Sequence, residues 1–125
     1  MKLGWRPQKW LEKKNKSGFR GYPVGTVAFY GPDNLRASKV AVAVITAEGA
    51  PPFALRRWFS EFGDVRIDST IMEEITAFLR AEEVRTVALS PTLMGCPHEE
   101  GIDYPEGEVC PHCPYWANRE RPLPR

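Results

Sequence analysis

The chain has 125 residues, of which 42% are hydrophobic, and its 17 basic and 16 acidic side chains give a formal net charge of +1 at pH 7. This length fits a single domain with a modest core. No stretch approaches the roughly 18 apolar residues of a membrane span and none near the N-terminus resembles a secretory signal, so we exclude a membrane protein and expect a cytoplasmic one.

Residues 1–21 form a basic arm that also carries aromatic side chains, with seven lysines and arginines against the single acid Glu12. Cations interleaved with aromatic rings can contact phosphates and stack on exposed bases, which predicts a DNA or RNA partner. Two alternatives stay open: the arm docks its tryptophans on the domain, or it folds back onto an acidic segment near the C-terminus. A short helix over residues 6–16 is possible. The candidate nucleic-acid-binding residues are Arg6, Lys9, Trp10, Lys13, Lys14, Lys16 and Arg20.

Two apolar runs follow and predict the centre of a sheet. Residues 23–30 form the first strand, which ends at Gly31 and Pro32. Residues 39–46 are so uniformly apolar that we expect an inner strand covered on both faces. A turn at Asp33 and Asn34 makes an antiparallel hairpin the natural pairing of the two strands.

The next segment is ambiguous, because the apolar side chains of residues 53–62 fit both strand and helix spacing, and we favour a strand. A helix follows, with Thr70 and Glu73 as a capping box and one apolar stripe that belongs to the core. Residues 84–90 then predict a buried strand, which a helical crossover brings onto the same sheet. The helix stripe comprises Ile71, Met72, Ile75, Phe78 and Leu79.

These elements together predict an α/β fold, with a small mixed sheet of three or four strands and one main helix. We expect residues 22–95 to form the core domain, residues 96–116 to form a zinc-binding loop packed on it, and residues 117–125 to form a flexible tail.

Every cysteine and both histidines of the chain lie between residues 96 and 113. Cys96 and His98 form a C-x-H turn. After an eleven-residue loop, Cys110 and Cys113 form a C-x-x-C turn. Two such turns facing each other supply the four tetrahedral ligands that zinc prefers, so we predict one zinc ion per chain.

The second histidine, His112, lies between the two cysteines of the C-x-x-C turn. The sulfurs of such a turn converge on the metal, so the side chains between them lie on the outer side of the bend. We therefore predict that His98 is a ligand and that His112 faces solvent or a partner. The predicted metal ligands are Cys96, His98, Cys110 and Cys113.

Two other uses of these cysteines were considered. A disulfide leaves one of three cysteines without a partner and suits a secreted chain, which this sequence does not resemble. The C-x-H turn also resembles part of a Rieske iron–sulfur pattern, but that centre needs histidine where Cys113 stands. Three sulfurs and one nitrogen form a set that zinc accepts.

Two sequence phrases resemble those of an uncharacterised family of small bacterial proteins: YPVGTVAFYGPD at residues 22–33 and GCPHEEGIDYPEGEVCPHCPYW at residues 95–116. The resemblance spans about residues 22–116. It implies a bacterial origin and a compact domain with the cysteine segment attached. It implies no known activity, and no functional residue is carried over from it.

The loop between the metal turns is acidic and could present a surface to a protein partner. Glu99 or Glu100 could act as a general base if zinc kept an open water position, but four protein ligands leave none. We therefore expect a small zinc-stabilised binding protein, a nucleic-acid-associated accessory factor that uses its basic arm. A protein–protein adaptor is the alternative, and a metal-dependent hydrolase ranks third. The acidic residues are Glu99, Glu100, Asp103, Glu106 and Glu108.

Overall fold

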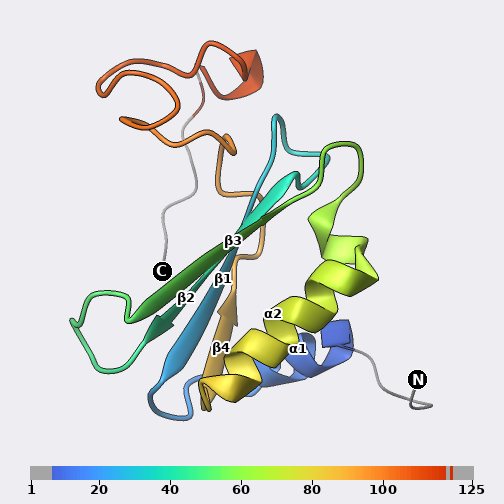
Figure 1. Ribbon diagram of the computed structural model, residues 1–125, viewed down its shortest axis with the longest axis vertical. Coiled ribbons are helices and arrows are strands. Elements are labelled where there is room, and N and C mark those ends of the chain that lie inside the picture. Colours follow the sequence, from blue (N-terminus) through green and yellow to red (C-terminus); the bar gives the residue numbers. More distant parts are fainter. Residues whose placement is uncertain (1–6, 118, 120–125) are drawn as a thin grey trace.

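The computed structural model describes residues 7–117 and 119 and shows a four-stranded sheet with two α-helices (Figure 1). It is an α/β fold, as the sequence predicts. None of the helices in these residues is long and apolar enough to cross a membrane. The elements in chain order are α1 (Pro7–Lys16), β1 (Val24–Tyr30), β2 (Lys39–Ile45), β3 (Ala54–Phe59), the 3₁₀ turn η1 (Val65–Ile67), α2 (Ser69–Ala81), β4 (Thr86–Leu89) and the 3₁₀ turn η2 (Pro114–Trp116).

The strands lie in the order β3-β2-β1-β4. β1 and β2 form the antiparallel hairpin that the sequence predicts, with Val27 opposite Val42. The ambiguous third segment is a strand, and it pairs with β2 in antiparallel fashion. α2 then crosses over, and β4 pairs in parallel with β1, with Val87 opposite Gly25. The sheet is therefore mixed.

α2 lies close to β1 because Gly25 has no side chain. A Cβ atom at that position would meet Cδ2 of Leu79 at 2.5 Å. The predicted capping box is wrong in its residues: Asp68 caps the helix, and its carboxylate accepts a hydrogen bond of 3.0 Å from the backbone N–H of Ile71. Thr70 stands inside the first turn, one residue after the helix begins. Aspartate and threonine are both good helix caps. Asp68 caps this helix because it immediately precedes the first helical residue and its backbone is extended.

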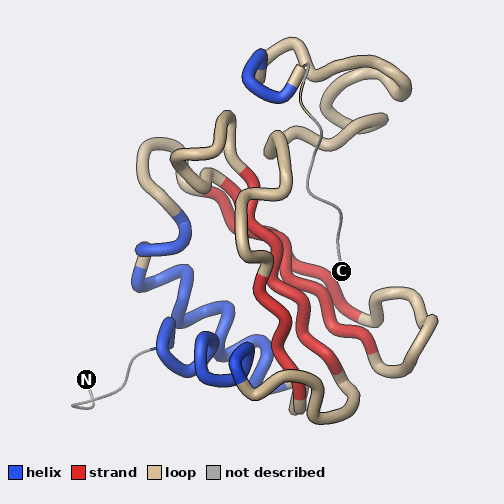
Figure 2. The backbone as a smooth tube through the Cα atoms, turned by 180° about the vertical axis from the view of Figure 1, so that it is seen from behind, coloured by secondary structure: helices blue, strands red, loops and turns tan. Residues whose placement is uncertain are grey.

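The expectation that β2 is covered on both faces is wrong. Both described helices lie on the same face of the sheet (Figure 2). On that face Val40, Val42 and Val44 are buried, whereas Ala41 and Ala43 point to the other face and are half-buried. Ala41 and Ala43 are small and apolar, so the strand looks uniformly apolar in sequence although no described helix covers their face of the sheet.

α1 packs on the domain and contacts β4 and α2. Its Leu11 is 2% exposed. The side-chain oxygen of Asn15 accepts a 3.0 Å hydrogen bond from the backbone N–H of Leu89 in β4. The described part of the predicted arm is thus docked on the core, and Trp10 packs against it, which agrees with the alternative that the arm docks on the domain. Residues 1–6, which include Arg6, and residues 120–125 of the predicted tail lie outside the described residues.

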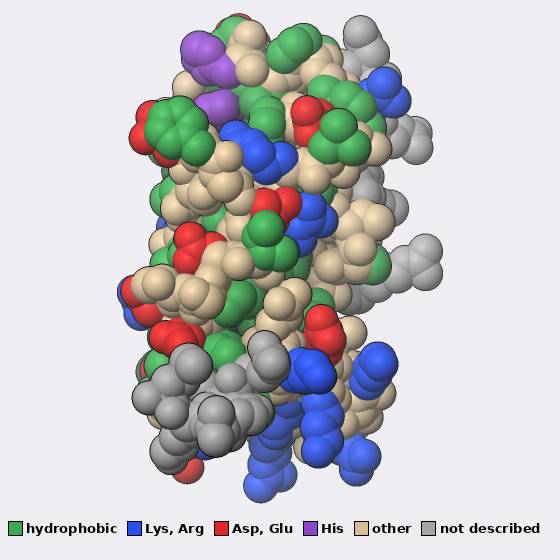
Figure 3. Space-filling view, turned by 90° about the vertical axis from the view of Figure 1, so that its right-hand side faces the viewer, with side chains coloured by type: hydrophobic (Ala, Val, Ile, Leu, Met, Phe, Trp, Pro, Cys, Tyr) green, Lys and Arg blue, Asp and Glu red, His purple; other side chains and the backbone are tan. Residues whose placement is uncertain are grey.

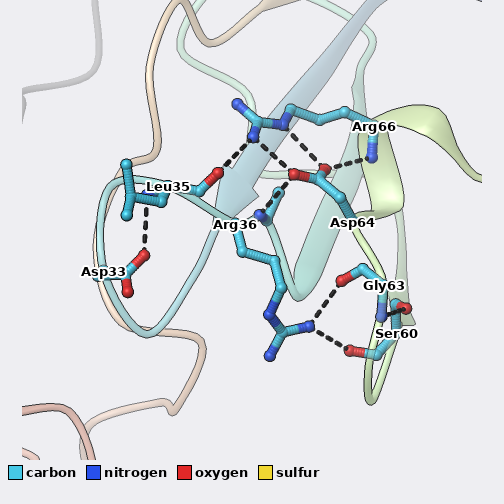
Figure 4. A network of polar contacts seen from close by, with 8 residues as sticks. Asp33, Leu35, Arg36, Ser60, Gly63, Asp64 and Arg66 are labelled. Carbon is cyan, nitrogen blue, oxygen red and sulfur yellow. Dashed lines mark hydrogen bonds and ion pairs between the residues drawn. The ribbon is translucent and has the colours of Figure 1, made fainter.

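A network of polar contacts joins the loop after β1, residues 31–38, to the loop after β3, residues 60–64 (Figure 4). Nη1 of Arg36 donates to the carbonyl oxygen of Gly63 at 2.6 Å and to that of Ser60 at 3.3 Å. Asp64 and Arg66 form the second half of the network.

Asp64 pairs with Arg66 at 2.6 Å and accepts a 3.1 Å hydrogen bond from the backbone N–H of Ala37. Arg66 also donates to the carbonyl oxygen of Leu35 at 3.1 Å. The hydrogen bond from Arg66 lowers the pKa of the Asp64 carboxyl from its ordinary value of 3.8 to about 2, against the opposing effect of burial. The ionised carboxylate therefore stabilises the fold.

Replacing Asp64 with asparagine is expected to lower the free energy of unfolding by about 1–2 kcal/mol at neutral pH, after allowance for partial solvent screening. The pKa of Asp64 is lower in the folded chain, so this contribution is complete above about pH 5 and disappears as the pH falls through about 2. Urea titrations of both proteins at matched pH values should show the difference shrinking on acidification. A constant difference would contradict this account of Asp64.

Candidate metal centre and basic groove

Cys96, His98, Cys110 and Cys113 come together at one point and form a possible metal site. Their ligand atoms all lie within 4.8 Å of one another. Nδ1 of His98 is 3.2 Å from Sγ of Cys96, 3.4 Å from Sγ of Cys110 and 3.5 Å from Sγ of Cys113. The structure therefore brings together all four predicted ligands.

These distances fit a single tetrahedral zinc ion. With Zn–N near 2.0–2.1 Å and Zn–S near 2.3 Å, tetrahedral angles place a nitrogen about 3.6 Å from each sulfur. The three observed nitrogen–sulfur distances, 3.2–3.5 Å, are slightly shorter than that value. Three sulfurs and one nitrogen are also a donor set that zinc accepts in structural sites.

Each of the two turns orients its ligands through the backbone. In the first, the backbone N–H of His98 lies 3.2 Å from Sγ of Cys96, which holds the turn closed. In the second, Cys113 leads directly into η2, where the backbone N–H of Trp116 donates to the Cys113 carbonyl oxygen at 3.1 Å. His112 is exposed and stands outside the cluster, on the outer side of its turn.

The three sulfurs are buried and belong to the hydrophobic core. Burial raises the pKa of the Cys96 thiol, and burial together with the neighbouring sulfurs raises that of Cys113. Thiolates at these positions therefore require a compensating cation. A divalent metal supplies that charge, because cysteine binds metal as thiolate.

Lys39 anchors the first metal turn to the sheet. Its side chain is 5% exposed, and Nζ donates to the carbonyl oxygen of Pro97 at 3.0 Å and to the carboxylate of Glu99 at 2.9 Å. Arg57 binds the same carboxylate at 2.7 Å. The hydrogen bond from Lys39, supported by Arg57, holds the pKa of Glu99 below its usual range. Glu99 is therefore an ionised structural anchor.

Trp116 anchors the other end of residues 96–116, which we call the metal loop. Its indole N–H donates to the carbonyl oxygen of Gly31 at 2.8 Å, a buried contact. The backbone N–H of Gly31 in turn donates to the carbonyl oxygen of Gly95 at 2.9 Å. The metal loop lies beyond the end of the sheet, above the loop after β1 (Figure 1).

The middle of the metal loop is acidic and carries two exposed apolar side chains, Ile102 and Val109. The loop is held by its own contacts: the backbone N–H of Glu99 donates to Asp103 at 2.7 Å. The backbone N–H of Gly107 donates to Glu100, also at 2.7 Å. Both glutamates that could have acted as a base are therefore engaged in holding the loop or its anchor.

The described basic residues of the arm gather at the other end of the molecule. Lysine and arginine side chains cluster at the lower end of Figure 3, and the histidines of the metal loop lie at the upper end. A groove of about 560 Å³ runs through this cluster, and we call it the basic groove. It is lined by Trp10, Lys13, Lys14, Ser17, Arg20, Val84 and Arg85.

Among the described residues, no acidic side chain lines the basic groove. In the described part of the chain, its cations take part in no salt bridge. Lys14 lies over the Trp10 ring at 5.7 Å from the ring centre. Of the other predicted arm residues, Lys9 and Lys16 are exposed on α1 but do not line the groove.

Arg85 was missed by the sequence analysis. It stands just before β4, far from the arm in sequence. It reaches the groove because β4 pairs in parallel with β1, whose preceding residues include Arg20 and Gly21. The Arg85 side chain lies next to Gly21, because a Cβ atom built on Gly21 would be 3.5 Å from Cδ of Arg85. Only the strand pairing could have revealed this neighbour.

Comparison with protein-family models, with curated proteins and with solved structures found no match to this chain.

Proposed function

We propose that this protein binds nucleic acid through the basic groove and that a structural zinc ion holds the metal loop. The observation that carries the first part is a concave surface with four cations where the described residues contribute no acidic side chain and form no salt bridge. Unpaired cations in a groove attract a polyanion and release its counterions on contact.

The zinc part is supported by the closed ligand set. Four protein ligands complete a tetrahedron and leave no position for a metal-bound water. The burial of all three cysteines in the core also favours a structural ion. The proposed zinc thus has the role of holding two turns together, and hydrolysis is not part of the proposal.

The basic groove is tested by replacing Lys13 and Arg85 together with glutamine and titrating a labelled oligonucleotide at several salt concentrations. We expect weaker binding and a salt dependence of log K shallower by about 1.4–1.8, because each lost phosphate contact removes about 0.7–0.9 from the slope. Both side chains are exposed, so the fold should be unaffected.

The matched control is Arg119→Gln, which removes a charge beyond η2, where the Arg119 guanidinium stacks on Tyr115 at 4.1 Å. This variant should bind with the affinity and salt slope of the wild type. Equal slopes for all three proteins would remove the basic groove from the proposal.

A protein–protein adaptor is the second candidate. The specific observation in its favour is the acidic metal loop, with Ile102 75% and Val109 55% exposed among carboxylates. Exposed apolar side chains ringed by charge are typical of docking surfaces. This candidate moves ahead if no oligonucleotide binds at low salt.

A further inference from the structure

We propose that the ligand of the basic groove is single-stranded nucleic acid, with an unpaired base stacked on Phe19. This inference rests on the proposed function and names its substrate class. It is carried by four observations: an exposed aromatic ring next in the chain to a groove residue, a segment held by hydrogen bonds that presents it, a second aromatic ring that is half-buried, and a helix short of groups that read base edges.

Phe19 is 66% exposed, although it is a large apolar side chain. It immediately precedes Arg20, which lines the basic groove. Its ring meets Tyr22 edge to face, with ring centres 5.3 Å apart and planes at 71°. An edge-to-face contact covers at most one face of the Phe19 ring, and base–aromatic stacking on the other face accepts any base.

The segment that carries Phe19 is fixed to β4 by Thr86. The Thr86 hydroxyl accepts a 2.8 Å hydrogen bond from the backbone N–H of Arg20 and donates to the carbonyl oxygen of Gly21 at 2.7 Å. Thr86 itself is buried. The backbone on either side of Arg20 is thus in place before a ligand arrives, which lowers the entropy cost of binding.

Trp10, the aromatic residue predicted to stack, is the less suitable one. It is half-buried and packs against the core. The ammonium group of Lys14 lies over its ring. Trp10 therefore forms part of the floor of the groove, and Phe19 is the more accessible of the two rings for a base.

A double-stranded ligand fits this surface less well. A duplex hides the faces of its bases, so Phe19 would find no partner there. Duplex sequence is read by side chains that reach base edges, commonly asparagine, glutamine and arginine. On α1 the Asn15 side chain is occupied by Leu89, and Gln8 is the other amide. The exposed positions of α1 are otherwise mostly lysines, whose phosphate contacts carry no sequence information. The two arginines of the groove, Arg20 and Arg85, lie outside this helix.

The test measures the fluorescence anisotropy of a labelled 20-nucleotide oligo-dT and of a duplex of equal length, with the full-length protein at one low salt concentration. We expect tighter binding of the single strand. Phe19→Ala should weaken single-strand binding by about tenfold and leave the salt slope unchanged, because it removes a stacking surface and no charge.

Three variants make the stacking role specific. Phe19→Trp should retain the affinity, and Phe19→Leu, which keeps an apolar side chain without a ring, should lose it. Phe62→Ala is the matched control, because Phe62 is 87% exposed and lies in the loop after β3, where neither it nor its chain neighbours line the basic groove. It should bind as the wild type does. All four variants should have the melting temperature of the wild type, because neither the Phe19 nor the Phe62 side chain is buried.

The two proposals fail in different ways. Equal or tighter binding of the duplex overturns the single-strand inference, and so does a Phe19→Ala protein of wild-type affinity when Lys13→Gln with Arg85→Gln is weakened. In both cases the basic groove stands. If neither oligonucleotide binds at low salt, the proposed function itself is overturned.

Discussion

Replacing His98 with alanine is expected to abolish stoichiometric zinc binding and to lower the melting temperature by about 10 °C or more. Nδ1 of His98 lies 3.2–3.5 Å from all three sulfurs, so its loss opens the tetrahedron. Structural zinc contributes its binding free energy to folding. In a domain of this size, about 1 kcal/mol corresponds to roughly 4 °C of melting temperature.

His112→Ala is the matched control for this experiment. The two histidine rings are neighbours, with centres 5.4 Å apart, yet His112 is exposed and lies outside the cluster. Elemental analysis should find one zinc per chain in the wild type and in His112→Ala. A strong chelator should bring the wild type down to the melting temperature of His98→Ala. Zinc lost from the His112 variant and kept by the His98 variant would reverse the assignment.

Gly31→Ala is expected to lower the free energy of unfolding by about 3–5 kcal/mol, at the upper end of single-substitution effects. A Cβ at this position would lie 1.9 Å from the backbone carbonyl oxygen of Arg36 and 3.1 Å from the Leu93 side chain. Backbone cannot move aside as a flexible side chain does. Urea denaturation of wild type and variant measures the loss.

The control for Gly31→Ala is Gly49→Ala. Gly49 has a positive φ of 75°, and a Cβ there would meet no atom within 4 Å. This variant isolates the cost of a left-handed alanine, about 1 kcal/mol. A Gly31→Ala protein as stable as Gly49→Ala would mean that the loop after β1 can relax away from the clash.

The cluster of one histidine and three cysteines could be predicted from sequence because each half of it is local. Cys96 and His98 share one turn, Cys110 and Cys113 share another, and the spacing within each turn already aims two donors at one point. The lysine that anchors the site could not be predicted. Lys39 appears in sequence as the polar start of an apolar strand, and only the fold places its ammonium group beside Glu99.

The position of the strands and the antiparallel hairpin of β1 and β2 could be predicted, because apolar runs and turns mark them directly, although the third segment also fitted a helix. Which face of a strand is covered could not, because Ala41 and Ala43 look as apolar as the valines between them. The sequence singled out Lys13, Lys14 and Arg20 of the basic groove but not Arg85. Arg20 and Arg85 line the same groove although they are 65 positions apart in the chain, because β4 pairs in parallel with β1.

The backbone of Gly31 holds both ends of the metal loop. Its N–H binds Gly95, just before the loop starts, and its carbonyl oxygen binds Trp116, at the loop's last residue. Both ends of the loop are therefore tied to the same residue, while Lys39 and Arg57 hold its first turn to the sheet. Closing a longer loop costs little once its ends are fixed together. The loop could accordingly be lengthened, shortened or exchanged between its two turns while the sheet keeps its register.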